Sequence, residues 1–138
     1  MRLYNVLIMG ASYGSLLASK LLLAGHSVTL ICLPDEAELI NLEGFRVRIP
    51  VRGSKSNIEI DSRALRGRLL ASGPANVRPS DYDLIGLAMQ EPQYRSAGVR
   101  ELLEAVAMAN APCMSIMNMP PLPYMRRIPG LDYDGLRA

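Results

Sequence analysis

The 138-residue sequence contains no tryptophan, a single histidine (His26) and two cysteines, Cys32 and Cys113. One histidine and two widely separated cysteines do not supply the cluster of ligands that zinc requires, so no metal site is expected. Both cysteines lie in apolar, strand-like stretches, and we expect buried thiols, as in a protein of the reducing cytoplasm. No apolar run approaches the roughly 18 residues that span a bilayer. No signal peptide is recognised either, so no membrane partner is expected.

A strong excess of charge is also missing. The formal net charge is +2, the pI is about 8.7, and the charged residues are scattered along the chain. This distribution argues against a nucleic-acid partner, which would need a concentrated basic surface. The length suits one domain with a hydrophobic core, and we treat residues 1–138 as one domain. Methionine is frequent, and we expect four of its side chains to fill the core: Met89, Met108, Met114 and Met117.

The first 32 residues predict a strand, a tight turn, a helix and a second strand. Asn5–Met9 is an apolar run of strand length, and the stretch 10–15 that follows is rich in small residues. Leucines then recur at helical spacing until Gly25, which takes the left-handed conformation that ends a helix. The β-branched run 28–32 predicts the second strand. Such a unit has a right-handed crossover and forms part of a parallel sheet.

The rest of the chain alternates strands and helices. Two stretches within 45–61 show the period-two alternation of half-exposed strands and predict an antiparallel hairpin. Further helices are expected at 34–43 and 94–110, and further strands at 69–71, 83–89 and 113–117. The apolar run 83–89 is typical of a strand buried on both faces of a parallel sheet. The sequence therefore predicts an α/β fold: a Rossmann-like, mainly parallel sheet flanked by helices, with an antiparallel hairpin insert around 46–61.

The turn after the first strand is the main candidate for a binding site. Unpaired backbone N–H groups and the helix dipole at such a turn favour an anion, so we predict that it binds a dinucleotide. The dinucleotide fingerprint is Gly-x-Gly-x-x-Gly, but Ser12 stands at its second glycine. The alternative is the same strand–helix–strand unit without a nucleotide. The predicted cofactor-binding residues of the turn are Gly10, Ala11, Ser12, Tyr13, Gly14 and Ser15.

The same turn also matches Gly-x-Ser-x-Gly, the pattern of a hydrolase nucleophile elbow, with Ser12 as the nucleophile. That fold needs strands before the elbow strand, whereas here the elbow would follow the first strand. It also needs an acid and then a histidine later in the chain. His26, the single histidine, lies at the turn that enters the second strand. A hydrolase is therefore disfavoured.

Polar residues follow the two later strands. Gln90 comes after 83–89 and Asn118 after 113–117, so both are expected at the carboxyl edge that carries the glycine turn. They are the only well-placed polar side chains that we expect there, and Gln90 is a further predicted cofactor-binding residue. Asn118 suits a carbonyl or hydroxyl beside a nicotinamide, or else is a turn residue. After the second strand, Leu33 can bind neither a ribose hydroxyl nor a 2′-phosphate, and Asp35 is either a displaced ribose ligand or a helix N-cap.

Five stretches resemble the amino-terminal half of the ketopantoate reductase (2-dehydropantoate 2-reductase) family. GSLLA at 14–18 and AGHSVTL at 24–30 are similar to its first strand–helix–strand unit, and 40–48, which contains EGF, to the hairpin that follows. DLI at the start of 83–93 and SIMN at 115–118 are similar to the next two strands. The resemblance implies a Rossmann domain that binds NADPH, with NAD as the other option. It also implies reduction of a 2-oxo acid by hydride transfer in pantothenate biosynthesis, with Asn118 as a catalytic residue.

The sequence departs from that family at functional positions. Gln90 stands where the family has a lysine, and Leu33 where it has an arginine for the 2′-phosphate. The glycine turn is one residue shorter and lacks the middle glycine. The family also has a helical second domain with its main catalytic lysine, which residues 1–138 do not include. We therefore expect this chain by itself to be inactive and to form a homo-oligomer. The alternative is a nucleotide-binding or interaction module without catalytic activity.

Overall fold

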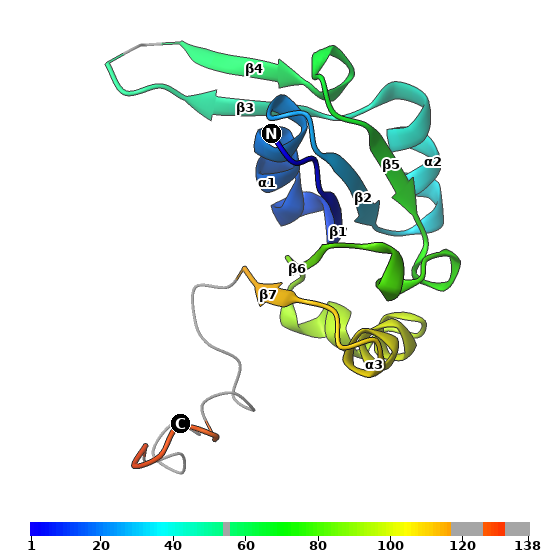
Figure 1. Ribbon diagram of the computed structural model, residues 1–138. Coiled ribbons are helices and arrows are strands. Elements are labelled where there is room, and N and C mark those ends of the chain that lie inside the picture. Colours follow the sequence, from blue (N-terminus) through cyan, green and yellow to red (C-terminus); the bar gives the residue numbers. More distant parts are fainter. Residues whose placement is uncertain (54–55, 117–125, 132–138) are drawn as a thin grey trace.

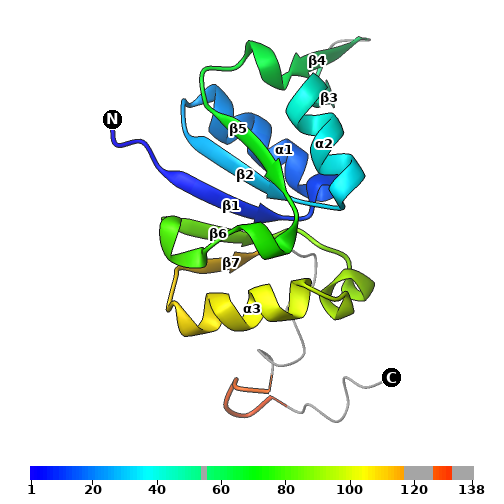
Figure 2. The same cartoon turned by 90° about the vertical axis from the view of Figure 1, so that its right-hand side faces the viewer.

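The computed structural model describes residues 1–53, 56–116 and 126–131. It contains a five-stranded sheet with the order β5-β2-β1-β6-β7, in which all neighbouring strands are parallel (Figure 2). The strands along the chain are β1 (Asn5–Met9), β2 (Ser27–Ile31), β5 (Leu69–Ser72), β6 (Leu84–Leu87) and β7 (Cys113–Ser115). The predicted Rossmann-like α/β fold is confirmed.

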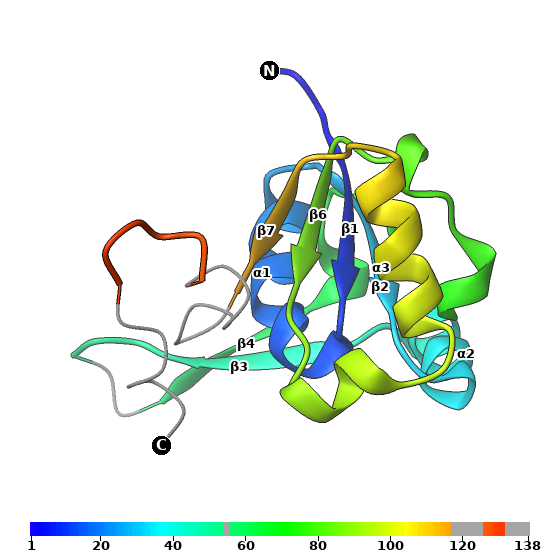
Figure 3. The same ribbon diagram turned by 90° about the horizontal axis from the view of Figure 1, so that it is seen from below.

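Helices cover both faces of this sheet. The main helices are α1 (Ala11–Leu23), α2 (Pro34–Glu43) and α3 (Val99–Met108). Figure 3 shows α1 and α3 on opposite sides of β1 and β6. Val6 and Ile8 of β1 pack with α1 and α2, whereas Leu7 and Met9 pack with α3. Burial on both faces explains why the central strands are continuous apolar runs. None of these helices, nor any other in the described part of the chain, is long and apolar enough to cross a membrane.

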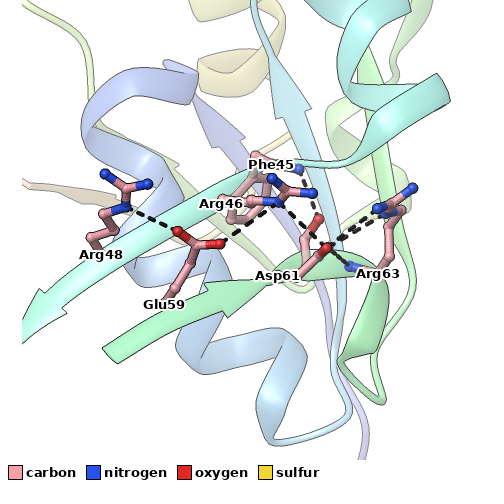
Figure 4. Close-up of polar contacts among 7 residues, drawn as sticks. Phe45, Arg46, Arg48, Glu59, Asp61 and Arg63 are labelled. Carbon is pink, nitrogen blue, oxygen red and sulfur yellow. Dashed lines mark hydrogen bonds and ion pairs between the residues drawn. The ribbon is translucent and has the colours of Figure 1, made fainter. Parts of the chain in front are cut away.

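The predicted hairpin is confirmed and forms a sheet of its own. β3 (Arg46–Pro50) pairs antiparallel with β4 (Asn57–Asp61). Arg48 Nε lies 2.9 Å from Glu59 Oε2, and Arg46 Nε lies 3.6 Å from Asp61 Oδ2 (Figure 4). The backbone N–H of Arg63, and then its guanidinium, hold the pKa of the Asp61 carboxyl below its ordinary value. Arg46 and Arg48 are thus paired with acids across the hairpin.

The helix expected over 94–110 begins later than the sequence pattern indicates. Glu91–Arg95 forms a 3-10 helix, and the α-helix begins at Val99. Gly98 separates the two because its φ of 79° is a left-handed conformation that an α-helix interior does not contain. The side chain of Glu101 accepts a hydrogen bond of 2.6 Å from the Gly98 N–H and so caps the start of α3.

The expectation of two buried thiols is wrong for Cys113. Its side chain is exposed because β7 lies at the sheet edge, with β6 as its only neighbour among the described strands. Cys32 is half-buried after β2. Burial, and to a smaller extent the nearby Glu36 carboxylate, raise the pKa of the Cys32 thiol to about 11. This thiol therefore stays protonated near neutral pH and is a poor nucleophile.

The methionines behave differently from one another. Met89 is buried, with 6% exposed, as the sequence predicts. Met108, the last residue of α3, is 88% exposed, and Met114 of the edge strand β7 is 39% exposed. The expectation that these two fill the core is wrong, because neither position has a second layer of structure over it among the described residues. Met117 lies outside the described residues.

Candidate functional site

The sheet has a topological switch point between β1 and β6. From β1 the chain passes to β2 and β5 on one side, and then to β6 and β7 on the other (Figure 1). Open α/β sheets bind ligands beyond the carboxyl ends of the strands at such a point. Gly10 follows β1 and the segment 88–90 follows β6. The candidate site is therefore the carboxyl edge between the start of α1 and the end of β6.

Gly10 follows β1 and contacts the ends of β2 and β6 at this edge. Its N–H donates a hydrogen bond of 2.9 Å to the carbonyl of Ile31 at the end of β2. A Cβ at position 10 would lie 2.5 Å from the carbonyl oxygen of Ala88, and the φ of Gly10 is +104°. Glycine is needed here because another residue would clash and would also be strained. Since the N–H of Gly10 is already bonded, the donors for an anion must come from the residues after it.

The first turn of α1 supplies these donors. The first hydrogen bond within the helix runs from the N–H of Gly14 to the carbonyl of Gly10, at 3.2 Å. The N–H groups of 11–13 precede it, and none of them has a backbone acceptor in the described part of the chain. The first turn contains no acid that would compete for these donors. Together with the helix dipole, the three N–H groups form a site that suits a phosphate.

Two residues of the predicted turn, Gly14 and Ser15, make contacts within the fold itself. A Cβ at Gly14 would lie 2.5 Å from Cγ2 of the buried Ile8, so this glycine lets α1 approach β1 closely. The hydroxyl of Ser15 donates to the carbonyl of Ser12 at 2.9 Å, inside the same turn. Direct cofactor contacts of all residues of this turn stay predictions, and the N–H groups that have no backbone acceptor among the described residues are those of 11–13.

The structure brings Tyr13 and Gln90 together across the switch point. The amide Nε2 of Gln90 donates a hydrogen bond of 3.0 Å to the hydroxyl of Tyr13, which is 77 positions away in the sequence. The backbone N–H of Gln90 donates to Oε1 of Gln93 at 2.7 Å, which fixes the turn after β6. Tyr13 was predicted as a site residue through its backbone alone. Its hydroxyl is a third polar side-chain group at this edge that sequence reasoning missed.

The end of β2 offers an apolar surface. Leu33 is 74% exposed and occupies the N-cap position of α2, with Pro34 as the first helical residue. Asp35 lies in the first turn of α2 and is not its N-cap, so that alternative for Asp35 is wrong. A carboxylate in the first turn interacts favourably with the helix dipole. Whether Asp35 also binds a ribose stays a prediction.

His26, the histidine that a nucleophile elbow would need, lies away from this geometry. His26 precedes Ser27, which pairs with Asn5 at the amino end of β1, so it lies at the opposite edge of the sheet from Ser12. Its Nδ1 accepts a hydrogen bond of 3.3 Å from the N–H of Tyr4. The two residues that a nucleophile elbow would pair are therefore at opposite edges. Asn118, the predicted catalytic residue, lies outside the described residues.

Comparison with known proteins shows the fold. No known family model matches the sequence, and no curated protein is significantly similar to it. The crystal structure of "a putative ketopantoate reductase from Ralstonia solanacearum MolK2" has the same fold, with a TM-score of 0.59 and 18% sequence identity. The match covers 92% of this chain but 36% of that protein, so this chain spans about a third of its length. The expected resemblance thus holds at the level of the fold.

Proposed function

We propose that this chain is the dinucleotide-binding domain of an NAD(P)H-dependent oxidoreductase that reduces a 2-oxo acid. The observation that carries the proposal is the set of N–H donors at 11–13, placed at the switch point of a Rossmann-like sheet. A bound nicotinamide dinucleotide would supply the hydride. The residues present fit the diphosphate group of such a cofactor, because backbone donors and a helix dipole meet there. The resemblance to ketopantoate reductases suggests the 2-oxo acid, with Asn118 beside it.

The fit is weaker for a 2′-phosphate, so we expect only a small preference for NADPH over NADH. Leu33 offers no charge at the end of β2, and Arg46 is engaged by Glu59 and Asp61 in the hairpin. A charged hydrogen bond to the 2′-phosphate would contribute about 1.5–3 kcal/mol, and without it the two affinities should be similar. Calorimetric titration measures both dissociation constants. A ratio well above about a hundredfold in favour of NADPH would contradict this expectation.

Replacing Ser12 by aspartate tests the binding site without disturbing the fold. Ser12 is exposed in the first turn of α1, and a carboxylate there stabilises the helix by about 0.3–1 kcal/mol. The same carboxylate repels a diphosphate held by the neighbouring N–H groups. We therefore expect Ser12→Asp to raise the dissociation constant for NADPH by about tenfold or more, since close like charges cost more than 1.4 kcal/mol in such a site.

The matched control is Ser12→Asn, which has nearly the same shape as Ser12→Asp and no charge. It should bind NADPH about as well as the parent. Thermal unfolding of all three chains checks that each is folded. Two results would contradict the proposal: binding by Ser12→Asp that equals binding by Ser12→Asn, or a parent chain that binds neither NADPH nor NADH.

A further inference from the structure

The hydrogen bond between Tyr13 and Gln90 links the start of α1 to the segment after β6 at the candidate site. Tyr13 belongs to the first turn of α1, next to the N–H donors, and Gln90 ends the segment 88–90 that follows β6. Both side chains are solvent-accessible, with Tyr13 61% exposed. The bond is therefore not part of the core, and nothing in the packing of α1 on β1 requires it. It connects the two elements between which a dinucleotide would lie.

The direction of this hydrogen bond leaves donors for a ligand. The Tyr13 oxygen accepts from the Gln90 amide, so its own O–H proton remains available to another acceptor. The Gln90 amide carries a second N–H in addition to the one donated to Tyr13. The backbone N–H of Gln90 donates to Oε1 of Gln93 at 2.7 Å, while its side chain donates to the Tyr13 hydroxyl. The pair thus presents two neutral donors at this edge.

The position of the pair relates it to one half of a dinucleotide. In a doubly wound sheet, the two nucleoside halves lie on the two sides of the switch point, with the diphosphate at the helix N-terminus between them. The hydroxyl of Tyr13 accepts its hydrogen bond from Gln90 in the segment 88–90 after β6, so it lies on the β6–β7 side. The half that lies toward β2 and β5 is on the other side of α1's first turn.

We propose that Tyr13 is a specificity-determining residue that binds the ribose hydroxyls of the nucleoside on the β6–β7 side, and that Gln90 is its positioning residue. This proposal rests on the proposed function, because it takes the ligand to be a dinucleotide. A phenol hydroxyl suits ribose hydroxyls, because each of these groups can both donate and accept a hydrogen bond. Gln90 stands where the family resemblance leads one to expect a lysine, so the hydrogen bond that positions Tyr13 involves no charge.

The test compares a complete dinucleotide with half of one. NADH and ADP share the adenosine and the first phosphates, but ADP lacks the second nucleoside. Tyr13→Phe removes only the hydroxyl, and we expect it to raise the dissociation constant for NADH by about threefold to tenfold, the loss of one ordinary hydrogen bond. The dissociation constant for ADP should stay unchanged. Tyr4→Phe, at the opposite edge of the sheet, is the matched control and should affect neither ligand.

Gln90→Leu provides the second arm. If Gln90 acts by holding Tyr13, this variant should also weaken the binding of NADH and leave the binding of ADP unchanged. The variant with both substitutions should then lose less binding free energy for NADH than the sum of the two single losses. If Tyr13→Phe weakened the binding of NADH and ADP equally, the hydroxyl would contact a part that the two ligands share, such as the phosphates, and the proposal would be overturned. Unchanged NADH binding would overturn it as well. Both results leave the proposed function intact, whereas a parent chain that binds no dinucleotide removes both.

Discussion

Replacing Gly10 by alanine should destabilise the protein by about 3 kcal/mol or more, with complete loss of dinucleotide binding. Two costs combine at this position. A left-handed backbone conformation costs a non-glycine residue about 1–2 kcal/mol, and the φ of Gly10 is +104°. The new Cβ would also lie 2.5 Å from the backbone oxygen of Ala88. Because that oxygen belongs to the backbone at the end of β6, relief requires β1 and β6 to move apart. Chemical denaturation measures the loss.

Gly53→Ala is the matched control for this change. Gly53, in the hairpin loop, also has a positive φ, of +86°, but an added Cβ there would meet nothing within 4 Å. It therefore reports the conformational strain without the clash, and we expect it to cost about 1–2 kcal/mol. A Gly10→Ala variant that loses no more stability than Gly53→Ala would show that the strand ends at the site are not packed as described.

The second large expected effect is the absence of turnover by this chain alone. Hydride transfer to a 2-oxo acid needs cofactor, substrate and a proton donor together in a site that excludes water. The segments that directly follow four of the parallel strands, 10–15, 32–34, 73–74 and 88–90, contain no lysine, arginine or histidine. His26 lies at the other edge of the sheet. We expect NADPH oxidation with ketopantoate or related 2-oxo acids to remain at background.

Turnover above background that disappears in Asn118→Ala would contradict this expectation. A chain that binds NADPH without turnover fits either reading of the function: one domain of a larger reductase, or a binding module without catalysis. We propose that a second copy of the chain covers the exposed carboxyl edge. Sedimentation with and without NADPH measures this association, and a strict monomer under both conditions would argue against it.

The sequence was sufficient for the fold because its strong signals are local. Apolar runs mark β1 and β6, and Gly25 and Gly44 both have the positive φ that ends the helices before them. The predictions that differ from the structure, the start of a helix and the burial of a thiol, depend on tertiary context. Gly98 breaks the helix expected over 94–110, because it takes a positive φ of 79° just before Val99, where the apolar stripe of α3 begins. Cys113 belongs to an apolar run whose exposure is set by its place at the sheet edge.

The side-chain contacts between distant segments could not be predicted. Asn41 of α2 donates to the carbonyl of Ala71 at 2.8 Å and accepts from its N–H at 2.8 Å, across 30 positions. The bond between Tyr13 and Gln90 spans 77 positions. Neither pair leaves a periodic signal, because each depends on the three-dimensional order of the strands. Because β1 and β6 are neighbours in the sheet, residues 13 and 90 lie at the same carboxyl edge, where a phenol and an amide can form a hydrogen bond.

The most direct test of the central claim is an amide NMR titration of the 15N-labelled chain with NADPH. The account predicts that the largest shifts fall on the backbone N–H groups of 11–13, with smaller shifts at 88–90 and no change in the hairpin at 46–61. The signals of 11–13 should move to positions typical of hydrogen-bonded amides as the phosphates bind. No shift in 11–13, or shifts confined to α3 or the hairpin, would contradict the assignment of this edge as a dinucleotide site.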